Sequence, residues 1–143
     1  MTVPSTAKQA TVLVCVTCGA ANAPAGTIPA GLRLARSTAA SAMHAADVRV
    51  AGVRCLANCS RGPSAAIRCD GAWTYIFGPL DAARDGPALV EGARLLAAAA
   101  DGLLPWRDRP DALKRAVVAR LPPAESPGDV VEAGCPSVGA LRP

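Results

Sequence analysis

Short runs of apolar residues along the chain predict four β-strands. The first is β-branched and nearly continuous, whereas the others alternate with polar or small residues. Asp70-Gly71 separates the last two runs, and this dipeptide is typical of a type I′ hairpin turn. The predicted strands cover residues 12–16, 47–55 with a possible bulge at Gly52, 65–69 and 73–77.

Apolar residues at helical spacing predict three helices, over residues 30–44, 85–102 and 110–121. The last of these rests on Leu113, Ala116, Val117 and Leu121, and Pro122-Pro123 should end it. The predicted order is therefore strand, helix, strand, strand, strand, helix, helix. Its first three elements form a βαβ unit, which requires two parallel strands with their carboxyl ends at the same edge of the sheet.

We expect a single α/β domain over residues 12–121, between a flexible N-terminus of residues 1–11 and a flexible tail of residues 122–143. The length of 143 residues suits one core, and the tail is rich in Pro and Gly without periodicity. No segment has the pattern of a signal peptide or a membrane span, so we expect a soluble cytoplasmic protein that does not bind membranes.

The net charge of +4 is spread along the chain without a long basic run. This distribution does not indicate nucleic-acid binding, but a mildly basic surface suits an acidic protein partner. The six cysteines are expected to be ligands or redox groups, because disulfide frameworks are rare in a reducing compartment.

Four cysteines form two closely spaced pairs, one at the end of each predicted parallel strand. Cys15 and Cys18 make a C-x2-C pair, and after a gap of 36 residues Cys55 and Cys59 make a C-x3-C pair. Both pairs should emerge at one edge of the sheet, where α/β folds place ligands. Four thiolates can hold an iron–sulfur cluster or zinc, and the spacing alone does not decide between the two metals.

The segments Val14 to Cys18, Val53 to Pro63 and Gly71 to Gly78 resemble a bacterial family of predicted metal-binding proteins. Their pattern is similar in turn to thioredoxin-like 2Fe-2S ferredoxins and to the small 2Fe-2S subunit of respiratory complex I. The first cysteine pair is narrower here than in those proteins, a spacing that also suits a single tetrahedral metal. The resemblance covers about residues 12–121.

This resemblance implies a thioredoxin-like fold (β-α-β-β-β-α with an additional C-terminal helix) and a one-electron carrier with a 2Fe-2S cluster. Metal ligands would be Cys15, Cys18, Cys55 and Cys59. The loop with Asn58, Arg61 and Gly62 would surround the cluster, with backbone N–H groups toward its sulfurs, close approach at Gly62, and positive charge from Arg61 or Arg54. It also implies a homodimer, a reductase and an acceptor enzyme as partners, and a link to cobalamin biosynthesis.

Two alternatives remain open: a zinc-binding four-cysteine protein with a structural or metal-handling role, and a thiol–disulfide pair formed by Cys15 and Cys18. We find no other catalytic constellation and therefore do not expect an enzyme that acts alone. Of the other candidates, Cys69 is expected to be a buried small hydrophobe, Cys135 a spare thiol in the tail, and His44 a cap at the end of the first helix.

Overall fold

The N-terminal βαβ unit forms as expected. The computed structural model describes residues 8–19, 24–125 and 130–131. Strand β1 (Ala10–Cys15) pairs in parallel with β2 (Val48–Val53), and helix α1 (Ala30–Ser41) connects them. Their register runs without a shift from Ala10 opposite Val48 to Cys15 opposite Val53, so the bulge predicted at Gly52 is wrong. The apolar pattern changes phase there because β2 is an edge strand, partly exposed on both faces.

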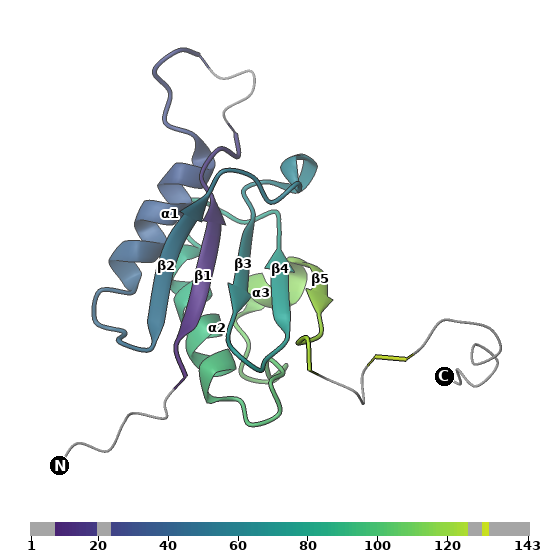
Figure 1. Cartoon of the computed structure of the whole chain (residues 1–143). Helices are drawn as coiled ribbons and strands as arrows, with labels where there is room; N and C mark the ends of the chain where they lie inside the picture. Colours follow the sequence, from purple (N-terminus) through teal and green to yellow (C-terminus); the bar gives the residue numbers. More distant parts are fainter. Residues whose placement is uncertain (1–7, 20–23, 126–129, 132–143) are drawn as a thin grey trace.

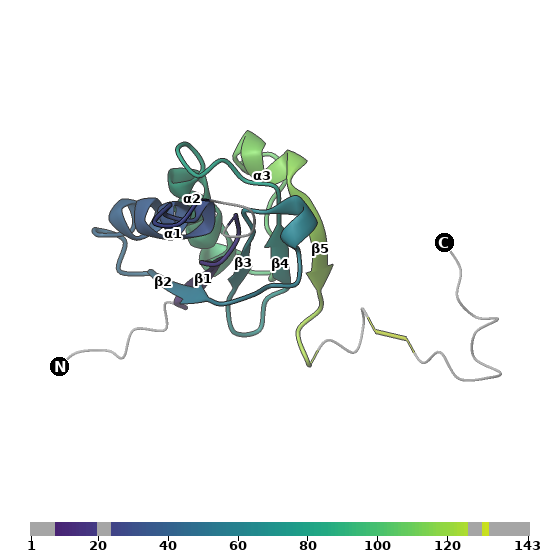
Figure 2. The ribbon, with the colours of Figure 1, turned by 90° about the horizontal axis from the view of Figure 1, so that it is seen from above.

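Five strands form one sheet in the order β2-β1-β3-β4-β5. Strand β3 (Ala65–Arg68) runs antiparallel to β1, and β4 (Thr74–Phe77) runs antiparallel to β3. Helix α1 and helix α2 (Gly86–Ala98) contact each other and lie on the same face of the sheet, as Figure 2 shows. The molecule therefore has two layers, with the helices on one side of the sheet.

The core lies between the helices and the covered face of the sheet. Alternation along β1 places Ala10, Val12 and Val14 on this face, each fully buried. Leu34 of α1 and Leu89 and Leu96 of α2 close the core from the other side. Tyr75 and Phe77 of β4 are also buried here, while Trp73 is partly buried at the margin of the core.

The β3–β4 hairpin is correctly predicted, but its turn type is not. A type I′ turn needs positive φ at both central residues, whereas only Gly71 has it here, with φ +75°. The N–H of Ala72 donates to the carbonyl of Cys69 at 3.0 Å, which closes the turn around Asp70 and Gly71. One glycine with positive φ is enough for this reversal.

The predicted third helix is wrong beyond Arg115. Helix α3 (Asp111–Arg115) is short, and the chain then forms β5 (Val117–Leu121), which pairs antiparallel with β4. The apolar residues that indicated one long helix divide between the two elements, since Leu113 and Ala116 are buried while Val117 and Leu121 are exposed. Backbone pairing with the exposed edge of β4 outweighs the local helical spacing.

Element boundaries differ from expectation by a few residues. Strand β1 begins at Ala10, so its first two residues fall in the segment expected to precede the domain. Helix α1 ends at Ser41 and α2 at Ala98, each a few residues earlier than expected. Residues 1–7 and most of the expected tail lie outside the described residues. Among the helices that the structure describes, none has the length and apolar character needed to cross a membrane.

Candidate metal centre

Two loops meet at the carboxyl ends of β1 and β2, at the top of the sheet in Figure 1. The first loop follows Cys15, the last residue of β1, and leads to α1. The second follows Val53, the last residue of β2, and includes the short 3-10 helix Cys59–Arg61. Backbone hydrogen bonds from Val16 N–H to the carbonyl of Val53 at 2.8 Å and from Cys15 N–H to that of Ser64 at 2.9 Å connect these segments. The two cysteine pairs therefore belong to the same edge of the sheet.

The first pair is buried against the start of α1. Cys15 is 1% exposed and Cys18 is 4% exposed. The N–H of Gly31, in the first turn of α1, donates to the carbonyl of Cys18 at 2.9 Å. A Cβ atom on Gly31 would lie 1.9 Å from the carbonyl oxygen of Cys15 and 3.2 Å from the Cβ of Cys18. Only glycine lets α1 approach this closely. The positive N-terminal end of α1 then lies beside the thiols.

The two thiols of the first pair differ in acidity. For Cys15, burial is the largest influence and raises the pKa. Hydrogen bonds from the Cys18 thiol, the Thr17 hydroxyl and backbone N–H groups at Leu56 and Thr17 outweigh it, so the pKa falls below its usual value. Burial, followed by the neighbouring Cys15, raises the pKa of Cys18 to about 11. Cys15 is therefore the thiol that ionises first.

Thr17 also connects the two loops. Its hydroxyl oxygen lies 3.7 Å from the sulfur of Cys15, and its single proton can be donated either to the carbonyl of Arg54 or to the Cys15 thiolate. The Cys15 thiol lies 3.7 Å from the same carbonyl. The first loop therefore contacts the residue directly before Cys55.

The second pair is exposed and held by a turn. The N–H of Ala57 donates to the sulfur of Cys55 at 3.2 Å, and Ala57 has a φ of +58°. Backbone N–H groups aimed at a cysteine sulfur stabilise its thiolate, as they do in iron–sulfur proteins. The pKa of Cys59 is raised, chiefly by its hydrogen bond with Cys55 and by the charge of that neighbour. The two cysteines therefore interact directly.

A small polar cluster beneath the second loop determines its shape. The side-chain amide of Asn58 donates to the hydroxyl of Ser64 at 2.9 Å, and that fully buried hydroxyl lies 3.4 Å from the carbonyl of Arg61. A Cβ atom on Gly78 would lie 2.4 Å from the carbonyl oxygen of Arg61 and 2.5 Å from Nδ2 of Asn58. Asn58 therefore supports the loop through its side chain.

Gly62 lies next to one cysteine of each pair. A Cβ atom on this residue would lie 2.9 Å from the sulfur of Cys18 and 3.6 Å from the carbonyl oxygen of Cys59. The charge of Cys15 contributes to the raised pKa of Cys59, and that of Cys59 to the raised pKa of Cys18. The pairs are thus close enough for their charges to interact.

The described residues do not form a closed metal cage. Over residues 8–19, 24–125 and 130–131, no three or more His, Cys, Asp or Glu side chains are gathered closely enough to hold a metal ion. The donor chemistry nevertheless fits a thiolate-bound centre, with two thiol pairs at one edge of the sheet and a backbone N–H on the sulfur of Cys55. Arg54 and Arg61 are exposed beside the loop, where their charges would favour a negative centre.

Cys69 and His44 lie apart from this edge. Cys69 is 7% exposed and belongs to the core cluster, as expected, and burial raises its pKa. His44 is exposed and follows the end of α1 by three residues. Cys135 lies outside the described residues.

Sequence reasoning missed four residues that shape the site: Thr17, Gly31, Ser64 and Gly78. Thr17 acts through a hydrogen bond to a segment distant in the sequence, and Ser64 through hydrogen bonds within its own loop. The two glycines matter because another segment packs on them. The position of Thr17 between Cys15 and Cys18 was the one available signal. A short polar residue inside a C-x2-C loop, such as Thr17, can donate a hydrogen bond to one of the thiols.

Comparison with solved structures shows the fold. The chain matches the structure of a thioredoxin-like [2Fe-2S] ferredoxin from Aquifex aeolicus with a TM-score of 0.52 and 18% sequence identity, over 82% of this chain and 98% of that one. The fold is therefore thioredoxin-like, as the sequence resemblance implied. No curated protein shows a significant sequence match. The family model described as "Protein of unknown function (DUF1636)" matches residues 12–123, and the chain belongs to this family.

Proposed function

We propose that the protein is a one-electron carrier in which Cys15, Cys18, Cys55 and Cys59 hold a 2Fe-2S cluster. The observation that carries the proposal is the position of two thiol pairs, from separate loops, at one edge of the sheet. The structural similarity to a thioredoxin-like [2Fe-2S] ferredoxin supports it at the level of the fold. A bound 2Fe-2S cluster would supply one-electron oxidation and reduction.

The residues of the site would bind and tune this group. Cys15 ionises most readily of the first pair, because its thiolate accepts hydrogen bonds from Cys18, Thr17 and Leu56. The N–H of Ala57 would stabilise the thiolate of Cys55, and Gly62 leaves room beside Cys18. Reduction adds one negative charge, which the exposed guanidinium groups of Arg54 and Arg61 would offset from the loop.

This proposal implies protein partners rather than a small-molecule substrate. A carrier needs a reductase that supplies the electron and an acceptor enzyme that consumes it, and does not itself catalyse a reaction. We extend the proposal to a cytoplasmic location and to a homodimer. The link to cobalamin biosynthesis stays a prediction.

One observation favours a second candidate, a thiol–disulfide pair. The pKa of Cys15 is lowered while that of Cys18 is raised to about 11, and such a pair has one attacking thiolate and one thiol that resolves the mixed disulfide. The second pair on the same edge argues against this candidate, because a dithiol mechanism does not need it. A zinc site with the same four cysteines remains the alternative within metal binding.

Anaerobic purification with metal and sulfide analysis separates these candidates. We expect a brown protein with about two iron and two acid-labile sulfide per chain. Dithionite should bleach the visible absorption and produce an EPR signal whose average g value lies below that of the free electron. A colourless protein with about one zinc per chain would favour the zinc site over the 2Fe-2S cluster. A metal-free protein that reduces disulfides through Cys15 would favour the dithiol.

A further inference from the structure

The outer edge of β2 has unpaired backbone groups. Strand β2 is the last strand on its side of the sheet and pairs only with β1. In the parallel ladder, Ala10 N–H donates to the carbonyl of Asp47 at 2.9 Å, and Val16 N–H to that of Val53. The ladder therefore uses alternate residues of β2, and Val50 and Gly52 direct both their N–H and their C=O groups away from β1. An extended chain could pair with these four groups.

A groove runs between this strand and α1. It has a volume of about 270 Å³, and its lining is mostly apolar. Side chains of α1 form one wall, and β2 forms the other. Its lining includes Val16, Leu32, Ala35, Arg36, Ala39 and Val50. A strand added to β2 would place alternate side chains over this groove, which is how strand addition gains specificity.

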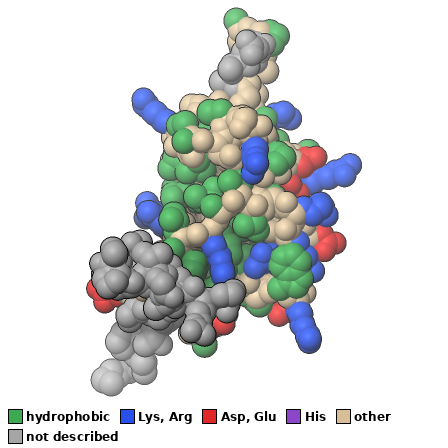
Figure 3. Space-filling view, turned by 90° about the vertical axis from the view of Figure 1, so that its right-hand side faces the viewer, with side chains coloured by type: hydrophobic (Ala, Val, Ile, Leu, Met, Phe, Trp, Pro, Cys, Tyr) green, Lys and Arg blue, Asp and Glu red, His purple; other side chains and the backbone are tan. Residues whose placement is uncertain are grey.

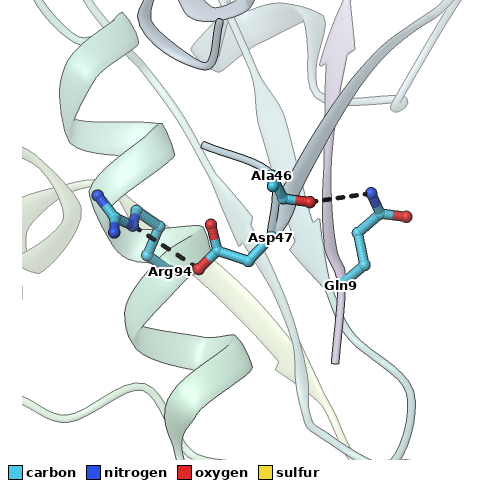
Figure 4. Close-up of polar contacts among 4 residues, drawn as sticks. All are labelled: Gln9, Ala46, Asp47 and Arg94. Carbon is cyan, nitrogen blue, oxygen red and sulfur yellow. Dashed lines mark hydrogen bonds and ion pairs between the residues drawn. The ribbon is translucent and has the colours of Figure 1, made fainter. Parts of the chain in front are cut away.

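The charges around the groove are almost all positive. Residues 24–56, which contain α1 and β2, include four arginines, Arg33, Arg36, Arg49 and Arg54, and all four are exposed. Asp47 is the one acidic residue of this segment, and its carboxylate lies 3.7 Å from Nε of Arg94 on α2 (Figure 4). On the face that carries β5, by contrast, Lys and Arg side chains lie beside Asp and Glu (Figure 3).

We propose that the edge of β2 binds an extended, acidic segment of a partner protein by strand addition. Its backbone would pair with Val50 and Gly52 and its apolar side chains would enter the groove. Its carboxylates would point to the opposite face of the sheet, where they would meet Arg49. A second copy of this chain fits less well, because two β2 edges would bring the same arginines against each other without acidic residues to offset them. The strand leads directly to Cys55, so the bound partner would lie beside the thiol edge.

This inference goes beyond the proposed function and does not depend on a metal. The probe is an acetylated and amidated octapeptide of alternating glutamate and valine, added to the full-length isotope-labelled protein and followed by amide chemical shifts. We expect saturable shifts at Val50, Gly52 and Arg49. The same peptide methylated on alternate amide nitrogens, and a lysine–valine peptide, should not bind.

Charge reversal separates this surface from a general charge effect. The double variant Arg36→Glu/Arg49→Glu should weaken peptide binding by about tenfold, because Arg49 lies on the face of the bound carboxylates and Arg36 adds positive charge at the wall of the groove. The matched control is Arg115→Glu, an exposed arginine on α3, which should leave binding unchanged within about twofold. Absence of peptide shifts in β2, or equal binding by the double variant and the wild type, would overturn the proposal. If the amide chemical shifts of β2 changed with protein concentration and not with peptide, the edge would bind a second copy of the chain. This result would also overturn the proposal.

Discussion

The two cysteine pairs occupy one edge of the sheet in opposite settings. Cys15 and Cys18 are buried, and they lie between the end of β1 and the first turn of α1. Cys55 and Cys59 are exposed on a loop whose shape depends on hydrogen bonds beneath it. The first pair is thus positioned by secondary structure and the second by a local polar cluster. This difference indicates that the second loop is the part able to adjust when a centre binds.

The largest effect is expected from Gly31→Ala, which acts on the first pair. The new Cβ would lie 1.9 Å from the carbonyl oxygen of Cys15, so α1 must move away from the loop. We expect a loss of about 3 kcal/mol in the free energy of unfolding, measured by denaturant titration. The control Gly26→Ala meets no atom within 4 Å and has φ +86°, so it should cost about 1 kcal/mol through backbone strain alone. Equal losses in the two variants would contradict tight packing at Gly31.

A smaller effect is expected from Ser64→Ala, which acts on the second pair. The substitution removes the buried hydroxyl that accepts from Asn58 and should cost about 1–2 kcal/mol. Hydrogen exchange should become faster at the amides of residues 55–62 while those of β1 stay protected. Ser60→Ala is the matched control, because Ser60 is exposed. Uniform acceleration across the sheet would show that the cluster supports the whole domain instead of the loop.

Within the first pair, alkylation of the metal-free, reduced protein should follow the two pKa directions. The thiolate is the reactive form, so Cys15 should react at a pH below its usual range and Cys18 only toward pH 11. The raised pKa of Cys18 also means that its contribution to stability is lost as the pH rises from about 9 to 11. The lowered pKa of Cys15 has the opposite sign, since its contribution is lost as the pH falls. Mass spectrometry after a timed pulse of iodoacetamide measures both sites, and identical pH profiles would contradict the asymmetry.

Thr17→Val tests the cause of that asymmetry. Loss of the hydroxyl removes one hydrogen bond to the Cys15 thiolate and should move its alkylation profile to higher pH. The profile of Cys69, which is buried far from Thr17 in the sequence, serves as an internal reference. An unchanged Cys15 profile would assign the low pKa to the remaining hydrogen bonds.

The smallest effect is expected from Arg61→Gln. The side chain is exposed, so the free energy of unfolding should change by less than about 0.5 kcal/mol. If the proposed cluster is present, loss of this positive charge should lower its reduction potential, measured by a spectroscopic redox titration. Arg115→Gln is the matched control on α3. Equal reduction potentials for Arg61→Gln and Arg115→Gln would show that the charge of Arg61 does not act on the cluster.

The sequence was sufficient for the elements with strong local signals. The apolar runs of β1 and β3, the alternation along β4, and the spacing of Leu89, Ala93 and Leu96 in α2 correspond to buried positions. The βαβ connection placed both cysteine pairs at one edge, because parallel strands end together. Local pattern failed at β5, since Val117 to Leu121 fits a helix by spacing and becomes a strand only by pairing with β4.

The details of the site could not be predicted because they depend on contacts that exist only once the loops have folded and packed. Asn58 was expected beside the centre, but its amide binds Ser64 below the loop, a contact that requires the loop to fold back. The need for glycine at position 31 arises only after α1 packs on Cys15. Residue type and spacing therefore indicated which side chains carry the chemistry, while tertiary packing determines their acidity and exposure.

The most direct test is the metal content of single cysteine variants. After anaerobic purification, we expect most of the iron and sulfide to be lost from each of four single variants: Cys15→Ser, Cys18→Ser, Cys55→Ser and Cys59→Ser. The control Cys69→Ser should keep both. That result would show that the two loops serve one centre. Full metal retention in the variants of either pair would contradict it.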